Sequence, residues 1–564
     1  MHIRDQFYSA TELKGSKGVI EKVERVDSNE SDEQVLGTTN LYQDGKLQCV
    51  PMPTPDPKDP LNLPRWRRWM AIISLCFFGA LALSAETIVG ALIPVFVLEY
   101  AGQDPKILGS LAGFPPDPSG IVPSSAVDQL AGLGGPPIWK VSLLSSLPIL
   151  TNGISSYFLV PASIAIGRRP VLLLCGVMAW AGGVWAGLSH SLDSHLAARC
   201  FQGLGAGAVE ALIPLVVQDL VFIHHRNRAM AGIWAAQGVI IICLGIGSPI
   251  IVVTTGWRLL YFLTAGLTAG AWLMVAAFVP ESRFPRSPAE LSGKSLYPLA
   301  PGEPRPALDY SQFGPRTLGT DFGIMNFGYQ FKEAGQSMLD TVRTMVFPNM
   351  IWAILVNSAI ISIYNAAAQT GSTVLLAAGW EFRKIGLAVI PIMVATPFVF
   401  LISGFFADKV SNWHAKRNGG RREPEAHLLS LVLPLLSGAT GCIAFGYAGE
   451  HIYTSHWSVL LIGTFLLAFS FLSVNTIAAV FVVESYPQWA GPVLVNVSSF
   501  RCIVGFAMSF RATTWIQARG YLGCFAIYAG ILGFLTLVMP LVYIYGKRIR
   551  AWTAGNVPTR GVKT

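Results

Sequence analysis

The stretch HLAARCFQGLGAGAVEALIPLVVQDLVFIHHRNR, residues 195–228, decides the fold. It is apolar over about the length of a bilayer, with an arginine near its start and a basic loop at its end. Glu210 lies in its middle, and charges inside a membrane usually face a partner or a water-filled cavity. Arg199 and Glu210 are close to three helical turns apart, so they share one face, with small residues such as Gly203 between them. We interpret this stretch as one wall of a transport pathway.

The composition indicates a membrane protein. The 564 residues are 52% hydrophobic and 13% charged, whereas soluble domains carry about 25% charged residues. The net charge of +8 fits basic cytoplasmic loops beside anionic lipid. No basic face on a soluble module is visible, so we expect the bilayer, and not nucleic acid, as a partner.

Motifs for catalysis and cofactors are not found. The sequence contains no H-E-x-x-H, C-x-x-C or nucleophile elbow, and no G-x-x-x-x-G-K-[ST] loop for nucleotide. Seven of the eight cysteines fall in apolar segments, and only Cys49 lies in a polar one, so neither a disulfide framework nor a metal site is indicated. We therefore expect no enzyme, no ATP-driven pump, no cofactor and no metal.

Twelve apolar runs, each near the roughly 20 residues of a spanning helix, fall into two groups of six. They lie at about 69–97, 140–165, 170–189, 196–222, 229–254 and 258–280, and at about 346–378, 385–407, 428–448, 456–483, 491–515 and 521–546. The expected fold is an all-α membrane protein of twelve transmembrane helices in two pseudo-repeated six-helix bundles.

Five segments follow from these runs. They are a disordered, mixed-charge tail at 1–68, a six-helix bundle at 69–280, a cytoplasmic central loop at 281–345, a second six-helix bundle at 346–546 and a short tail at 547–564. The central loop has seven basic and seven acidic residues and no apolar periodicity. The basic residues lie mostly in the loops that are cytoplasmic when both termini are cytoplasmic, so we expect both termini there.

Two loops at equivalent places in the halves carry related motifs. VPASIAIGRRPVLL, after the second run, resembles the major facilitator signature loop G-x-x-x-D-R-x-G-R-R-x, and GFFADK repeats the G-x-x-x-D-K part in the second half. The matching residues are Gly167, Arg168 and Arg169 in the first loop and Gly404, Asp408 and Lys409 in the second. Val160 and Ile164 replace the first Gly and the Asp of the first motif.

RCFQGLGAG is similar to the fourth-span signature R-x-x-Q-G-x-G of the same superfamily, with Arg199, Gln202, Gly203 and Gly205 matching. VPESRFPR, NLPRWRRW, GGPPIWKVSLL and AKRNGGRREPEAHL resemble a narrower fungal group of twelve-span, drug:proton-antiporter-like transporters near the yeast histidinol and polyamine permease. The resemblance covers about residues 60–550 and implies the major facilitator fold.

In that fold the first, fourth, seventh and tenth spans line the central cavity, so the resemblance puts Glu86 and Glu210 on the pathway. A buried carboxylate can exchange a proton or bind an ammonium group. The alternative is a structural hydrogen-bond anchor between helices. Arg199, with Gln202 beside it, either couples to a proton carrier, as the motif implies, or caps the helix and snorkels to the surface.

Further polar residues recur inside apolar runs. Asn357, Tyr364 and Gln369 in the seventh span and Asn475 in the tenth either bond substrate or hold helices together. We expect Arg501 in the eleventh span to be structural, paired with Glu484 or a backbone dipole.

Asp219 lies near the end of the fourth span. We expect it to pair with Arg226, Arg228 or the Arg168–Arg169 loop, and so to belong with the two motif loops to the gate.

The predicted function is secondary active transport of a small organic solute, coupled to protons, with a cationic or amine-bearing substrate. The alternatives are a multidrug or secondary-metabolite exporter and a non-transporting nutrient sensor. We expect a monomer in the plasma membrane, with the vacuolar membrane as the alternative.

Overall fold

The computed structural model describes residues 39–109, 135–323, 328–451 and 454–556, apart from short gaps at 41, 44–45, 48, 292, 294, 299–302, 304 and 420. Residues 1–38 and 557–564 of the expected tails therefore lie outside the described residues.

Twelve helical segments in the described part of the chain are long and apolar enough to span a membrane, as the sequence predicts. The first half comprises α3 (Arg65–Thr87) with η2 (Ile88–Leu92) and α4 (Ile93–Tyr100), then α6 (Ile138–Ile166), α7 (Arg168–Leu188), α8 (Leu192–Leu220), α9 (Arg226–Thr254) and α10 (Trp257–Phe278). The second half begins with α15 (Pro348–Ala377) and continues with η5 (Phe382–Val389), α16 (Ile390–Val399), η6 (Phe400–Phe406) and α17 (Ala407–Arg417), which together make one span. The ninth and tenth spans are α18 (Ala426–Glu450) and α19 (Ser458–Ser485). The eleventh comprises α20 (Ala490–Val495), η8 (Asn496–Phe500) and the first limb of α21 (Arg501–Asn556), and the second limb of α21 is the twelfth. The two limbs of α21 meet in a bend at Gly520, where φ is 74°.

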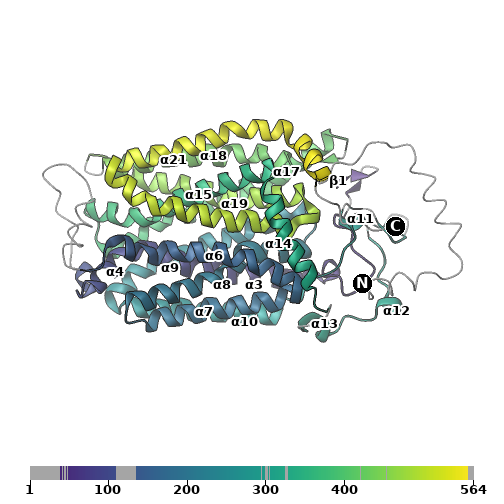
Figure 1. The fold of residues 1–564 in the computed structure, drawn as a ribbon, viewed down its shortest axis with the longest axis horizontal. Coiled ribbons are helices and arrows are strands. Elements are labelled where there is room, and N and C mark those ends of the chain that lie inside the picture. The colour runs from purple at the N-terminus through teal and green to yellow at the C-terminus, as the bar shows by residue number, and fades with distance from the viewer. Residues whose placement is uncertain are drawn as a thin grey trace. The chain divides into compact units, whose positions relative to one another are not determined.

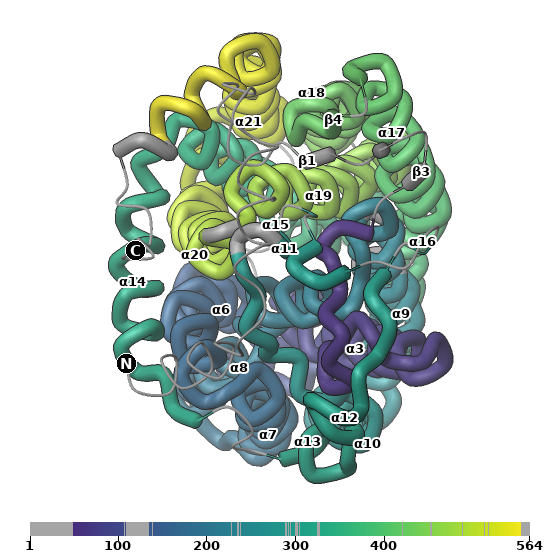
Figure 2. Tube along the Cα trace, turned by 90° about the vertical axis from the view of Figure 1, so that its right-hand side faces the viewer, coloured from purple at the N-terminus to yellow at the C-terminus, as the bar shows by residue number. Residues whose placement is uncertain are grey.

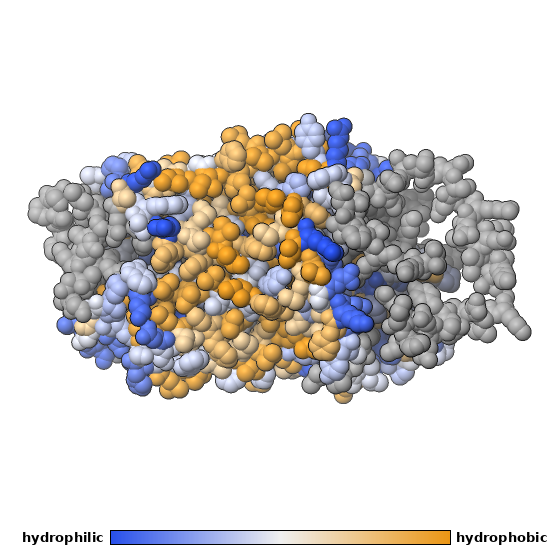
Figure 3. Space-filling model, in the orientation of Figure 1, coloured by the Kyte–Doolittle hydropathy of each residue, from blue (hydrophilic) through white to orange (hydrophobic). Residues whose placement is uncertain are grey.

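The spans pack as two groups. In the first, α6 and α7 both pack on α8; in the second, α18 packs on α19 and α21. Figure 1 shows the purple and blue helices on one side of the bundle and the green and yellow helices on the other. The groups meet where α6 contacts α21 and η8, and where α9 contacts η5, α16 and η6. Figure 3 shows an apolar band between polar ends, so the predicted all-α membrane fold is confirmed.

Glycine brings α8 into the centre of the first group. A methyl group at Gly205 would lie within 2.9 Å of the backbone of Cys175 and Ala179 on α7, and one at Gly203 would collide with Pro148 on α6. Small residues permit this close packing, since helices in a bilayer associate through van der Waals contact. Gly203 and Gly205 thereby let α6 and α7 pack closely against α8.

One end of the bundle holds the Gly167 and Asp408 loops; we call it the basic end. Here residues 49–63 pack against the turn that follows α8 and against the central segment, which differs from the disordered tail expected for 1–68. Asp59 is fully buried, accepts the backbone N–H groups of Thr54 and Leu61, and pairs with Arg286 at 2.5 Å. The sequence does not reveal the ion pair, because Arg286 lies 227 residues from Asp59.

Four two-residue strands lie in the same region. β1 (Thr39–Asn40) pairs with β4 (Arg421–Arg422), and β2 (Tyr42–Gln43) pairs with β3 (Lys46–Leu47), both antiparallel.

The central segment is not a plain loop. It contains α11 (Pro288–Leu291), α12 (Tyr310–Phe313) and α13 (Leu318–Phe322), followed by the longer helix α14 (Phe331–Met345). The expectation that 281–345 lacks apolar periodicity is wrong for α14, whose buried and exposed residues alternate at helical spacing. Its periodicity is easy to miss because the buried face is the polar one.

Candidate functional site

An ion pair between Glu210 of α8 and Arg501 of α21 lies in the interior of the bundle. The side chains are 5% and 3% exposed. Arg501 also donates to the amide oxygen of Asn475 on α19, and the Cys502 thiol donates to Glu210 at 3.5 Å. Since α8 belongs to the first half and α19 and α21 to the second, this cluster joins the two halves.

Glu484, one of the two partners expected for Arg501, does not pair with it. Glu484, at the end of α19, pairs instead with Arg422 of β4 at 2.9 Å and with His427 of α18 at 3.0 Å. All three side chains are buried. Arg501 therefore belongs to the central cluster and not to this second, more terminal one.

Glu86 on α3 lies beside the central cluster. Its side chain is buried, and its carboxylate accepts a hydrogen bond from Nδ2 of Asn152 on α6 at 3.3 Å. Among the residues that the structure describes, no cation makes an ion pair with this carboxylate. The positive charges of Arg199 and Arg501 act on it from beyond ion-pair distance.

Arg199 is fully buried and uses its donors on nearby backbone and amide oxygens. Its guanidinium donates to the carbonyls of Leu144 at 3.1 Å, Ala85 at 2.9 Å and Glu86 at 2.6 Å, and to Oε1 of Gln202 at 2.5 Å. The snorkelling alternative does not fit this burial. Arg199 instead holds the turn of α3 that carries Glu86.

Spans seven and ten place polar and aromatic groups in the interior. The ring of Tyr364 on α15 stacks on Phe471 of α19 with centroids 4.6 Å apart. The amide nitrogens of Gln369 and Asn475 have no hydrogen-bond partner among the described residues. Asn357, in contrast, donates to a carbonyl of its own helix at 2.9 Å. Tyr364, Gln369 and Asn475 therefore retain groups that a polar ligand could use. The amide nitrogen of Asn357 is already hydrogen-bonded within its own helix.

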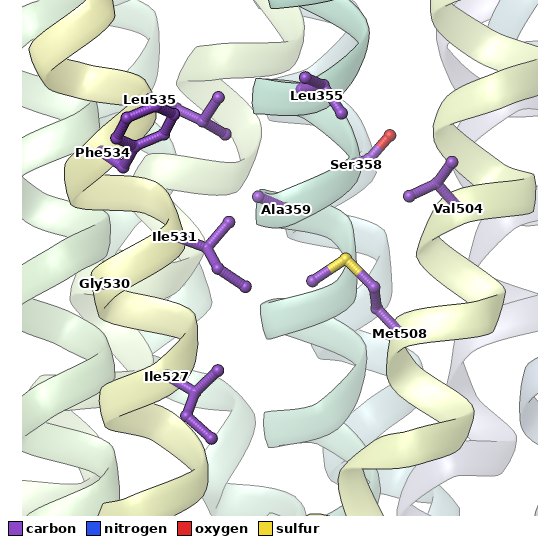
Figure 4. Close-up of a pocket in the computed structure, with 10 residues that line it drawn as sticks. All are labelled: Leu355, Ser358, Ala359, Val504, Met508, Ile527, Gly530, Ile531, Phe534 and Leu535. Carbon is purple, nitrogen blue, oxygen red and sulfur yellow. The ribbon is translucent and has the colours of Figure 1, made fainter.

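An apolar crevice of about 540 Å³ lies elsewhere, between α15 and the two limbs of α21 (Figure 4). Phe534 and Leu355 on its rim are 67% and 42% exposed. Among the lining residues, Ser358 is the one with a side-chain hydroxyl, and this hydroxyl already donates to a carbonyl of its own helix. The crevice offers nothing to a charged solute and is distinct from the central cluster.

The first motif loop is held by two carboxylates. Arg168 pairs with Asp219 of α8 at 2.5 Å, one of the pairings expected for Asp219. Glu281, after α10, accepts the backbone N–H groups of Arg168 at 3.0 Å and Arg169 at 3.1 Å. Gly167 has φ of 116°, a conformation that favours glycine. These contacts stay within the first half and the segment that follows it.

The second motif loop makes a contact between the halves. Asp408 of α17 is 1% exposed, and its Oδ2 lies 3.5 Å from Nε of Arg228 on α9. Arg228 also lies over the ring of Phe405. Gly404 is buried in η6, whereas Lys409 is exposed. Of the three matched residues, Asp408 is the one whose side chain bridges the halves.

Sequence reasoning missed Asn152 and Cys502, which touch the two central carboxylates. Asn152 stands in the apolar run LPILTNGISSYFL, where an isolated amide is itself a signal for an interior partner. Cys502 carries no comparable signal, because buried cysteines commonly serve as small apolar residues.

Comparisons with known proteins agree with this arrangement. Residues 75–509 match the family model described as Major Facilitator Superfamily. An uncharacterized MFS-type transporter of Schizosaccharomyces pombe is 22% identical over 91% of this chain and 90% of its own. Protein HOL1 of Saccharomyces cerevisiae is 20% identical over 94% of this chain and 98% of its own. Efflux pump FUB11 of Gibberella fujikuroi is 25% identical over 72% of this chain and 70% of its own.

Solved structures show the same fold. The human organic anion transporter MFSD10 (TETRAN) superposes with a TM-score of 0.55 at 17% identity, covering 85% of this chain and all of that one. The xylose transporter XylE from E. coli, in a partially occluded inward-open conformation, gives a TM-score of 0.55 at 13% identity and covers 84% of this chain and 98% of that one. Because the family match spans most of its length, the chain belongs to the Major Facilitator Superfamily and is an integral membrane transporter rather than an enzyme.

Proposed function

We propose that this chain is a proton-coupled transporter of a small, amine-bearing organic cation. The observation that carries the proposal is the Glu86 carboxylate, which is buried and has an amide, but no cation, in direct contact among the described residues. A buried carboxylate without a paired cation is costly unless it binds a proton or a cationic ligand.

The charges around Glu86 supply a coupling mechanism. Glu86 and Glu210 carry two negative charges, and Arg199 and Arg501 carry two positive charges, so the cluster is balanced when all four are ionised. A substrate ammonium beside Glu86 adds one positive charge, and a proton on Glu86 adds the same. Each therefore opposes the other at Glu86, so proton and cation are exchanged in opposite directions, and the proton gradient drives the cation toward the acidic side of the membrane.

The polar and aromatic groups of α15 and α19 suit the rest of such a substrate. Stacked rings attract a cation through their π faces, and Tyr364 and Phe471 form one such pair. Gln369 and Asn475 add amide groups. We propose that the halves rock around this site and that Arg168–Asp219 and Arg228–Asp408 act at the gate.

Labelled spermidine uptake, with and without a proton uncoupler, tests the proposal in cells expressing the wild type, Glu86→Gln and Glu210→Gln. Glu99→Gln is the matched control, since Glu99 lies at the far end of the same span in a partly exposed pair with Arg258. We expect an uncoupler-sensitive change in spermidine accumulation, relative to cells without the protein, in the wild type and the control, and a loss of that change by at least about tenfold in Glu86→Gln. Full proton-coupled uptake by Glu86→Gln would overturn the role of Glu86.

Export of drugs or secondary metabolites is the second candidate, because several relatives, FUB11 among them, are efflux pumps. Retention of preloaded amines or drugs distinguishes the directions. Lower retention in expressing cells than in controls, with no accumulation, would support an exporter.

We further propose that the basic end faces the cytoplasm, that both termini lie there, and that the monomer works in the plasma membrane, with the vacuolar membrane as the alternative. The concentration of Arg and Lys in the loops of that end supports this orientation. Protease accessibility of an epitope placed after residue 556, in intact and permeabilised cells, tests it.

A further inference from the structure

Helix α14 presents its polar face to the protein and its apolar face outward. Ser337, Asp340, Thr341 and Thr344 are at most 4% exposed. The large apolar residues point the other way: Phe331 is 67%, Leu339 59%, Val342 53% and Val346 70% exposed. A helix on the surface of a soluble protein shows the opposite pattern, so the outward face of α14 is built for an apolar surrounding.

A narrow cationic edge separates these two faces. On a helical projection of 100° per residue, Lys332, Gln336 and Arg343 lie together between the apolar and the buried sectors. All three are exposed. Arg343 keeps half of its side chain exposed, with Asp340 as a neighbour at 3.4 Å. Basic residues at the border of an apolar face are typical of helices that lie in a membrane interface.

The helix is attached to both halves at the basic end. Nδ2 of Asn496 in η8 donates to the carbonyl of Thr341 and to Oγ1 of Thr344, both at 2.9 Å. On the other side, Tyr157 of α6 donates to the carbonyl of Met338 at 3.4 Å. Figure 2 shows α14 along the outer edge of the bundle beside α6 and α20.

The apolar face of α14 continues that of the spans. Ile154 and Phe158 of α6, the helix on which α14 packs, are 43% and 56% exposed on the outside of the bundle. The surrounding that covers Phe158 therefore also covers the outward face of α14. In a membrane protein that occupant is the acyl region of the adjoining leaflet, with phosphate groups at the level of the cationic edge.

We propose that α14 is a lipid-binding interfacial helix that selects anionic phospholipid in the leaflet at the basic end. Phe331, Leu339, Val342 and Val346 enter the acyl boundary, and Lys332 and Arg343 contact the headgroup phosphates. Because α14 is bonded to α6 and to η8, the bound lipid holds the halves together at that end.

Photo-crosslinking in vesicles tests the placement. The photoreactive residue p-benzoylphenylalanine replaces Leu339 in the full chain, and Tyr310 serves as the control. Tyr310 is 58% exposed in the same central segment, and its helix α12 lies beyond the ends of the spans (Figure 1). We expect several times more lipid adduct, read by mass spectrometry, from position 339. Equal yields at the two positions would overturn the proposal.

Lipid selection is tested in vesicles of phosphatidylcholine mixed with phosphatidylserine, with the probe at position 339. Two basic residues at an anionic surface favour phosphatidylserine by roughly tenfold or more, and K332Q/R343Q should remove that preference. The matched control R383Q/K384Q removes two exposed charges from the opposite end and should retain it. An adduct ratio unchanged in K332Q/R343Q, or lost equally in the control, would overturn the selection of anionic lipid.

Discussion

Arg501 of the second half and Glu210 of the first half form a buried ion pair between α21 and α8. Because of this pair, the two central carboxylates have different partners. Glu210 has a permanent counter-charge, whereas Glu86 has an amide partner. Two acids that look equivalent in the sequence therefore differ in structure, with Glu210 suited to joining the halves and Glu86 suited to exchanging ligands.

Glu210→Gln should destabilise the protein more than Glu210→Gln combined with Arg501→Gln. The single change leaves a buried guanidinium without its counter-charge, which costs about 3–5 kcal/mol in proteins, whereas the double change removes both charges. Thermal unfolding of the purified protein in detergent measures the difference. A double variant whose loss equals the sum of the single losses would mean that the two residues are not coupled.

Gly205→Ala should lower the unfolding temperature, because the new methyl group meets the backbone of α7. Overpacking of this kind costs about 1–3 kcal/mol. Gly270→Ala in α10 is the control, since a methyl group there meets nothing within 4 Å. Alanine is also the better helix former, so the control should be neutral or slightly stabilising. Equal effects at both positions would contradict the close packing of α7 and α8.

The sequence predicts the parts of this molecule that rest on local pattern. Hydropathy reveals twelve spans, and the glycines of α8 reveal close packing. It does not predict contacts that depend on the packing of distant helices: Arg501 with Glu210, or Asn152 with Glu86. Helix α14 escaped detection for a different reason, because its apolar residues face outward and its polar residues face the protein.

Asp59→Asn should loosen the segment formed by residues 49–63. Asp59 is fully buried and pairs with Arg286, whose side chain is 8% exposed, so removing the charge leaves a buried cation without its partner. We expect faster cleavage of this segment in limited proteolysis. Asp56→Asn is the control, since Asp56 is half-buried and its carboxylate caps the neighbouring Lys58 N–H. Cleavage at the same rate in both variants would contradict the anchoring role of Asp59.

Asp408→Asn should weaken contact between the halves at the basic end. Its carboxylate approaches Arg228 of the opposite half, and loss of its charge removes that attraction. A cysteine pair at Val160 and Gly491 reports the contact, because a methyl group at Gly491 would lie 3.3 Å from the Val160 side chain across the interface, within reach of a disulfide after small adjustment.

We expect oxidant to link Val160→Cys with Gly491→Cys readily when Asp408 is present and less readily in Asp408→Asn. Asp193→Asn supplies the control, since Asp193 makes an exposed pair with Lys140 at the opposite end, within one half. Exposed pairs contribute little, so the control should leave the linking rate unchanged. If the rate were the same in all three backgrounds, the Arg228–Asp408 contact would not hold the basic end closed, and the gate would rest on the backbone contacts of α6, α20 and η8.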